Sequence, residues 1–144
     1  MEKELQENLL QAWVEMSVCI RGNRMLSQVS FNEIVICGIL YRNALWKEAP
    51  LTATDLCERM KLLKSQINRL TTAMEENGLI CKRRSMEDKR KIYLELQEKG
   101  RALYEQEHKR VMKILDAVTE ALGEDGVEQL TGLVKETVAV VNRE

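Results

Sequence analysis

The apolar residues of this chain change their spacing at Gly78, and this change constrains the fold more than any other feature. Before that glycine, Ile67, Leu70 and Met74 follow one another at i, i+3 and i+7, which is the spacing of a helix with one buried face. After it the period becomes 2, which is the spacing of strands, and Ile92, Leu94 and Leu96 alternate with Lys91, Tyr93 and Glu95. A polar helix is therefore expected to run directly into a hairpin.

A second short helix is expected just before this pair. Thr52 and Asp55 have the spacing of a capping box, which predicts a helix that begins after Thr52 and runs to about Met60. A turn over 61–64 separates it from the polar helix, which should end before Gly78 because glycine favours the left-handed conformation of a helix end. Two short helices followed by a hairpin predict a winged helix-turn-helix.

The rest of the chain is predicted to be mostly helix around this unit. One proline and an aromatic content of 4% agree with a mainly α protein that carries a small β-hairpin wing. Before the winged unit, we expect a helix over 3–22, a connector over 24–30 and a largely buried helix, which Ser30 and Glu33 cap and Pro50 ends. The hairpin should have strands over 79–84 and 90–96 with a turn over 85–89. After it we expect a helix over 98–122, a break over 123–126 and a last helix from Val127.

The basic residues gather in the middle of the chain. Residues 59–91 hold ten basic and four acidic residues, a net charge of +6, although the whole chain of 144 residues has a net charge of −1. The flanks therefore carry −7, and such asymmetry is typical of a nucleic-acid face on an acidic body. Charge alone fits a solvated surface equally well. The place of the basic hairpin, directly after two short helices, favours contact with DNA.

The exposed face of the polar helix is predicted to enter the major groove, where each base pair presents a distinct pattern of donors and acceptors. Arg69 is the best candidate for a base contact because a guanidinium binds guanine through two hydrogen bonds. Lys64 and Ser65 suit phosphates at the start of the helix. The candidate contacts are Lys64, Ser65, Gln66, Asn68, Arg69 and Thr72 on the helix, with Arg84, Asp88, Lys89 and Arg90 on the wing.

This arrangement resembles the MarR family of bacterial transcriptional regulators. The resemblance is carried by residues 51–56 (LTATDL), Ser65, Arg69, Leu70, residues 74–80 (MEENGLI), Asp88-Lys89-Arg90 and Gly100. Asp88 and Arg90 look like the Asp-x-Arg signature of the family's wing. The chain departs from the family at Leu63 and Gln97, which stand where capping residues are usual, and a missing cap costs roughly 0.5–2 kcal/mol.

The resemblance implies a homodimer that binds a pseudo-palindromic operator in double-stranded DNA, more often as a repressor than as an activator. Residues 1–30 and 98–144 would form a helical dimerisation region, and residues 31–97 the winged helix-turn-helix DNA-binding region. Asp88 would orient the wing arginines, and Arg90 would reach the DNA groove. Many members release DNA when a small aromatic or amphipathic ligand binds between these regions. The candidate pocket residues here are Trp13, Met16, Ile20 and Phe31.

Two alternatives stay open at this point. A thiol-based oxidant-sensing regulator needs an exposed cysteine with a lowered pKa, and Cys19 is the candidate. Cys37 and Cys57 are expected in the core, and Cys81 on a wing strand. A winged-helix protein-interaction module without DNA binding is the other alternative, but such a module has no need of a net charge of +6 around its polar helix.

Catalysis, metals and cofactors have no support in the sequence. The single histidine forms a lone Glu-x-x-His with Glu105, and a bundle metal site of that kind needs a second copy. The N-terminus is acidic where a signal peptide is basic, and the longest apolar run, over 34–41, is too short to span a bilayer. We therefore expect a cytoplasmic protein that is not an enzyme, has no cofactor and makes no membrane contact.

Overall fold

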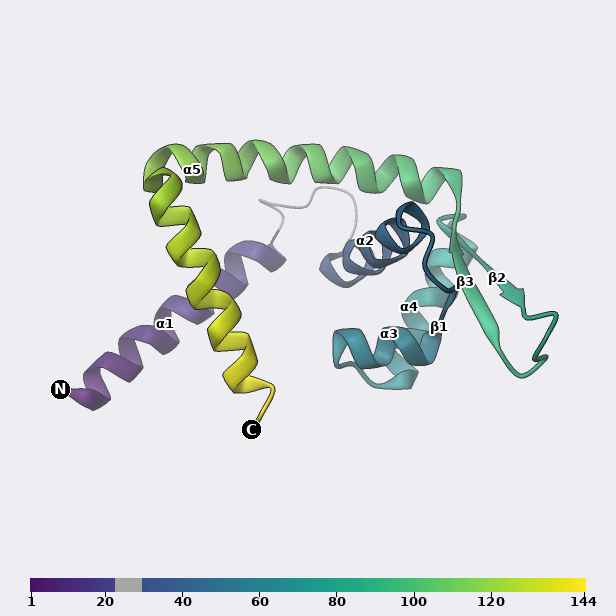
Figure 1. The fold of residues 1–144 in the computed structure, drawn as a ribbon, viewed down its shortest axis with the longest axis horizontal. Coiled ribbons are helices and arrows are strands. Elements are labelled where there is room, and N and C mark those ends of the chain that lie inside the picture. Colours follow the sequence, from purple (N-terminus) through teal and green to yellow (C-terminus); the bar gives the residue numbers. More distant parts are fainter. Residues whose placement is uncertain (23–29) are drawn as a thin grey trace. The chain divides into compact units, whose positions relative to one another are not determined.

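The chain folds into helices and one small antiparallel sheet (Figure 1). The structure, a computed structural model, describes residues 1–22 and 30–144 and divides into two compact units, residues 1–108 and 109–144. The connector expected over 24–30 lies outside the described residues, apart from Ser30. The predicted fold class, mainly α with a β wing, is confirmed.

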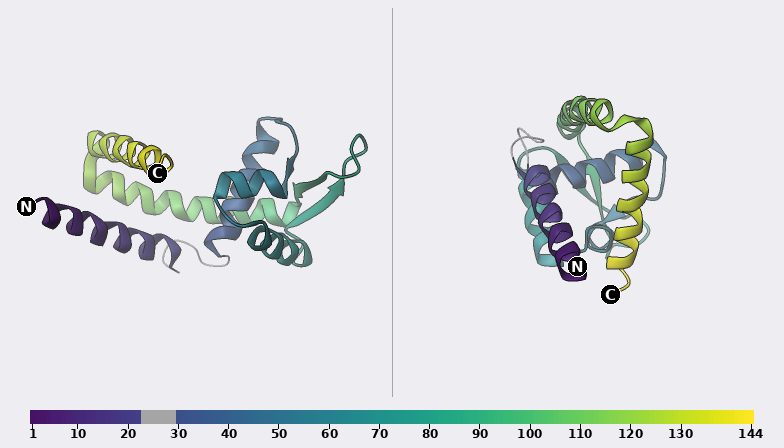
Figure 2. Two further views of the ribbon diagram at one scale, coloured as in Figure 1. Left: turned by 90° about the horizontal axis from the view of Figure 1, so that it is seen from below. Right: turned by 90° about the vertical axis from the view of Figure 1, so that its left-hand side faces the viewer.

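The first unit contains the predicted winged helix-turn-helix. Its elements are α1 (Glu2–Arg21), α2 (Phe31–Leu45), β1 (Leu51–Thr52), α3 (Ala53–Met60), α4 (Lys64–Glu76), β2 (Ile80–Arg84), β3 (Ile92–Leu96) and the first part of α5, which spans Glu98–Val141. The hairpin of β2 and β3 forms the wing and extends beyond helices α2 to α4, as the left view of Figure 2 also shows.

The sheet differs from the predicted hairpin in one respect. It has three strands in the order β1-β3-β2, because Leu51 pairs with Leu94 and Thr52 with Tyr93. Sequence reasoning assigned residues 51–52 only to the start of a helix, so β1 was missed. Strand β3 also begins two residues later than predicted, which leaves Arg90 and Lys91 in the wing turn.

The core of this unit lies where α2, α3, α4 and the sheet meet. Helix α2 is buried over Ile36–Leu40, in agreement with its apolar sequence, and Leu56, Ile67 and Met74 reach the same core from α3 and α4. Ile80 and Leu94 close it from the sheet. The wing thus starts from buried strand positions, and its base is held by hydrophobic packing.

The two predicted caps are present, but the predicted end of α2 was wrong. Ser30 Oγ accepts a hydrogen bond from Glu33 N at 3.3 Å, and Thr52 with Asp55 forms both halves of a capping box. Helix α2 ends at Leu45, well before Pro50, since Lys47 takes the left-handed conformation with φ 52°. A proline requires only that a helix has ended before it and does not fix the last residue.

The second unit is helical over residues 109–141. The predicted break lies at the correct place but is narrower than expected, because only Gly123, with φ 76° and ψ 164°, departs from helical angles. Many large apolar side chains are exposed on this unit and on α1, among them Leu5, Leu9, Leu133 and Val138. In the described ranges, no helix combines the length and the apolar character that a membrane crossing requires.

Candidate nucleic-acid interface

Helix α4 has one buried face and one exposed polar face. Ile67, Thr71 and Met74 are buried, while all six predicted contact residues on this helix are exposed, namely Lys64, Ser65, Gln66, Asn68, Arg69 and Thr72. Thr71 was not expected in the core. Its hydroxyl can be buried because Oγ1 donates a hydrogen bond to the Ile67 carbonyl oxygen at 2.9 Å, which satisfies it inside its own helix.

The start of α4 is capped in an unexpected way. Leu63 has no side-chain acceptor, as the sequence indicates, but Gln66 Oε1 accepts a hydrogen bond from Leu63 N at 3.0 Å. This is the reciprocal half of a capping box, with glutamine at the third helical position. The side-chain carbonyl of Gln66 is therefore occupied within the helix, and its amide hydrogens remain for an external acceptor.

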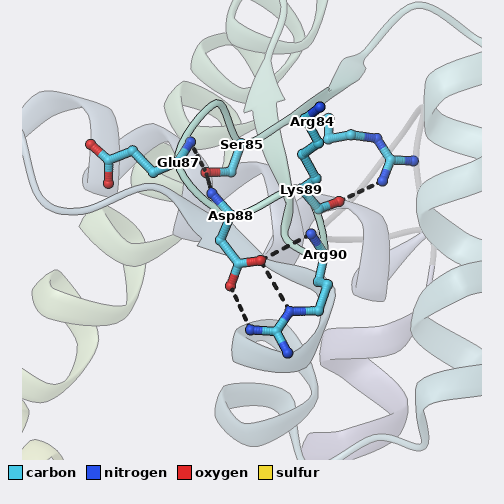
Figure 3. Close-up of polar contacts among 6 residues, drawn as sticks. All are labelled: Arg84, Ser85, Glu87, Asp88, Lys89 and Arg90. Atoms are coloured by element: carbon cyan, nitrogen blue, oxygen red, sulfur yellow. Dashed lines mark hydrogen bonds and ion pairs between the residues drawn. The ribbon is translucent and has the colours of Figure 1, made fainter.

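The wing tip carries an ion pair between Asp88 and Arg90 (Figure 3). Asp88 Oδ1 accepts hydrogen bonds from Arg90 N at 3.1 Å and from Arg90 Nε at 3.2 Å. These two donors lower the pKa of the Asp88 carboxyl below its ordinary value. Arg90 Nη2 also donates to Asp88 Oδ2 at 3.5 Å, so the pair holds one edge of the guanidinium, while the Arg90 side chain as a whole is still 91% exposed.

The basic side chains of β2 have partners within the protein. Arg84 Nη1 donates to the Lys89 carbonyl oxygen, so Arg84 braces the turn (Figure 3). Arg83 forms an ion pair with Glu95 on the neighbouring strand, with 2.7 Å between Nε and Oε1. Lys82 Nζ lies 3.5 Å from Thr72 Oγ1 and so connects the wing to the exposed face of α4. Sequence reasoning did not single out Lys82.

A groove of about 600 Å³ lies between α4 and the wing. Its lining includes Lys64 and Asn68 of α4 together with Lys82, Arg90 and Lys91 of the wing. Four cations from two elements thus surround one concave surface. The alternation along β2 could have identified Lys82, because it lies two residues after the buried Ile80 and on the same face of the strand, which is the face toward α4.

The predicted pocket residues lie elsewhere in the first unit. Trp13 and Met16 are exposed on α1, while Ile20 and Phe31 are partly buried, and the guanidinium carbon of Arg21 lies 4.8 Å from the centre of the Phe31 ring. The groove of α4 and the wing includes none of these four residues. Their role in ligand binding stays a prediction.

The cysteines differ strongly in their surroundings. Cys19 is exposed on α1, Cys37 is buried as expected, and Cys57 and Cys81 are partly buried. Burial, together with the nearby Glu33 carboxylate, raises the pKa of the Cys37 thiol to about 11. Within the described part of the chain, no group of three or more histidine, cysteine or acidic side chains could hold a metal ion.

Comparisons with known proteins agree with this geometry. The family model described as MarR family matches residues 43–92, which run from the end of α2 to the start of β3. The homoprotocatechuate degradative operon repressor of Escherichia coli is 28% identical over 88 residues, which are 61% of this chain and 60% of that repressor. The chain therefore matches less than two thirds of that relative's length.

Two solved structures illustrate the shared fold. The S. aureus MepR–DNA complex superposes with a TM-score of 0.74 and 16% identity, over 94% of this chain and 96% of that one. NadR in complex with 4-hydroxyphenylacetate superposes with a TM-score of 0.69 and 24% identity, over 92% and 91% of the two chains. At these identities the likeness concerns the fold.

Proposed function

We propose that the chain is a DNA-binding transcriptional repressor of the MarR family of winged helix-turn-helix proteins. It would bind double-stranded DNA as a homodimer on a pseudo-palindromic operator and leave the DNA when a small aromatic or amphipathic ligand binds. The observation that carries the proposal is the groove in which Lys64, Lys82, Arg90 and Lys91 bring cations of α4 and of the wing together.

The exposed face of α4 has the chemistry that base recognition requires. Asn68 and Arg69 lie on it, and these side-chain types bind adenine and guanine edges through paired hydrogen bonds. Arg90, exposed at the wing tip, would reach the neighbouring minor groove or the phosphate backbone. Cations on both sides of the groove would neutralise phosphates, while α4 would carry the sequence preference.

The exposed apolar residues support a homodimer. Leu5 and Leu9 on α1, and Leu133 and Val138 in the second unit, are each more than half exposed in the single chain. Large apolar surfaces on one subunit mark interaction sites, and most homodimers bury the same patch on both subunits around a two-fold axis. A two-fold dimer also matches the symmetry of a pseudo-palindromic operator.

Two observations support the proposal of ligand control. The NadR complex holds an aromatic acid on the same fold, and Trp13, Met16, Ile20 and Phe31 offer apolar and aromatic surface on α1 and at the start of α2. The Escherichia coli relative named above is an operon repressor. We infer that the protein acts in the cytoplasm as a regulator and is not an enzyme.

Two arginine variants test whether Arg69 contacts bases and Arg90 contacts the DNA irrespective of its sequence. Fluorescence anisotropy would compare a duplex from the region upstream of the protein's own gene with a scrambled duplex of the same length. Arg69→Ala should weaken binding to the upstream duplex by about 1–3 kcal/mol and change binding to the scrambled duplex much less. Arg90→Ala should weaken both alike.

Arg143→Ala provides the matched control, since it removes the same charge from an exposed position at the end of the second unit. It should leave both affinities within about twofold of the unmodified protein, as expected for a surface change outside the site. Equal losses on both duplexes for Arg69→Ala would refute its base contact. Full affinity of Arg90→Ala for both duplexes would refute the role of the wing.

A further inference from the structure

We propose that Ser85 is a positioning residue that fixes the wing tip so that Arg90 is presented to DNA. The proposal rests on the DNA-binding function proposed above and assigns a role to a residue that itself would not contact DNA. It follows from the hydrogen bonds of the turn between β2 and β3, which Figure 3 shows.

Ser85 is buried, whereas the other residues of the turn are exposed or, in the case of Asp88, partly exposed. It is 5% exposed, whereas Met86, the next residue, is 90% exposed. Ser85 Oγ accepts hydrogen bonds from two consecutive backbone groups, Glu87 N at 3.2 Å and Asp88 N at 3.1 Å. A serine hydroxyl that accepts from the residues two and three positions ahead defines a tight turn. Ser85 therefore sets the path of the chain as it leaves β2.

The backbone of Ser85 anchors this turn to the sheet. Ser85 N donates to the Lys91 carbonyl oxygen at 2.9 Å, one step beyond the last strand pair, which is Arg84 with Ile92. Lys91 N in turn donates to the Asp88 carbonyl oxygen at 2.9 Å. The backbone of Asp88 is thus held at its N–H by Ser85 and at its carbonyl by Lys91.

This arrangement connects Ser85 to Arg90 through Asp88. Once the Asp88 backbone is fixed, its carboxylate accepts from both the backbone N and the side-chain Nε of Arg90. The ion pair is exposed, and exposed pairs of free side chains gain little because water screens them and ordering two side chains costs entropy. A pre-set turn removes much of that entropic cost, so Asp88 depends on Ser85 to hold Arg90 in place.

Hydrophobic burial offers the turn little support. The large apolar side chain at its tip, Met86, lies almost entirely in solvent, and Ile92 at the start of β3 is also exposed. The conformation of the wing tip therefore depends on polar contacts. Two of these contacts are accepted by Ser85 Oγ, which belongs to the most buried side chain of the turn. Alanine at this position would leave Glu87 N and Asp88 N without that acceptor.

Ser85→Ala tests the proposal in the full-length protein. Its affinity for both the upstream and the scrambled duplex should fall by about three- to tenfold, and the magnitude of its salt slope by up to about one, because the phosphate contact of Arg90 is weakened. In an Arg90→Ala background the same change should alter affinity by less than about twofold, since residues that act through one another are not additive.

The matched control is Ser30→Ala. Ser30 Oγ also accepts a backbone hydrogen bond, from Glu33 N, but at the start of α2. This variant should keep DNA affinity within about twofold even if its helix cap is weakened. Amide hydrogen exchange at Glu87 and Asp88, followed by NMR without DNA, should become faster in Ser85→Ala and stay unchanged in Ser30→Ala.

The outcomes separate this inference from the proposed function. If the unmodified protein binds no duplex, the proposed function fails and the role of Ser85 falls with it. If the protein binds DNA and loses affinity on Arg90→Ala but not on Ser85→Ala, only the role of Ser85 is overturned. The proposal is also overturned if Ser85→Ala lowers affinity equally with and without Arg90, or if it unfolds the whole first unit, because its effect should be confined to the wing tip.

Discussion

Gly100 lies where the wing meets α5, and replacing it with alanine should destabilise the first unit. The residue is buried, and a Cβ atom placed on it would lie 2.3 Å from the Leu79 carbonyl oxygen and 2.7 Å from Leu96 Cδ1. The same carbonyl oxygen accepts a hydrogen bond from Gln97 N at 2.8 Å. The extra methyl group would therefore push against backbone at the junction between the β2 start and α5.

The magnitude follows from three contributions. Forcing a methyl group into a packed site costs about 1–3 kcal/mol. Weakening the hydrogen bond from Gln97 N to Leu79 O adds about 0.5–1.5 kcal/mol. Alanine is favoured over glycine within a helix by about 0.5–1 kcal/mol, which offsets part of the loss. Gly100→Ala should thus lower the free energy of unfolding by about 2 kcal/mol, the middle of the range that these contributions allow, and the thermal midpoint by about 4–8 °C.

Gly132→Ala is the control for this prediction. It makes the same substitution on the same helix, but a Cβ there meets no atom within 4 Å. Circular dichroism during thermal and urea unfolding should show Gly132→Ala to be as stable as the unmodified protein or slightly more so. The steric reasoning is refuted if Gly100→Ala matches the unmodified protein, or if both variants lose stability equally.

Two further predictions concern a helix cap and a buried thiol. Thr52→Ala should cost about 1–2 kcal/mol in urea unfolding because it removes one half of the α3 capping box, while Thr54→Ala, exposed on the same helix, should change stability by less than about 0.5 kcal/mol; equal effects would contradict the cap. At pH 8, iodoacetamide should label exposed Cys19 well before Cys37, whose pKa is raised to about 11 by burial. Because the thiol of the unfolded chain ionises near its ordinary value of 9.0, stability should fall as pH rises from 9 toward 11, and Cys37→Ala should remove that part of the fall.

Local patterns in the sequence predicted most of the winged unit. The change of period at Gly78 located both α4 and the hairpin, and Gly78 has the left-handed φ of 75° that a helix end favours. Thr52 with Asp55 located the start of α3 because a capping box needs only two side chains three residues apart. Each of these features depends on neighbours in the chain.

Features that depend on distant partners were harder to predict. Strand β1 exists because its two residues pair with β3, some forty positions later in the chain. A strand of two residues is too short to show a periodic pattern in the sequence. The end of α2 depends on the left-handed Lys47 and on Asn43, whose Nδ2 donates to the Ala49 carbonyl oxygen at 3.1 Å. Pro50 was the nearest visible signal and was misleading.

The candidate site also has some features that depend on neighbours in the chain and others that depend on distant partners. The exposed face of α4 could be predicted from the spacing of Ile67 and Met74, because the opposite face of an amphipathic helix is solvated. Gln66 was assigned only to DNA contact, although its place three residues after Leu63 also suits a capping role, which the structure shows. The alternation of strand faces after Ile80 could have placed Lys82 on the face toward α4, but the place of Lys91 in the groove depends on how the wing turn packs beside α4, which no local pattern gives.

The salt dependence of DNA binding shows whether the groove between α4 and the wing binds the DNA backbone. If Lys64, Lys82, Arg90 and Lys91 each neutralise one phosphate, the logarithm of the binding constant should fall against the logarithm of KCl concentration with a slope of about −3 to −4 per protomer. Replacing all four with glutamine should bring that slope close to zero while the protein stays folded. Absence of binding at about 50 mM KCl, or a steep slope that survives the fourfold replacement, would contradict binding of the DNA backbone by this groove.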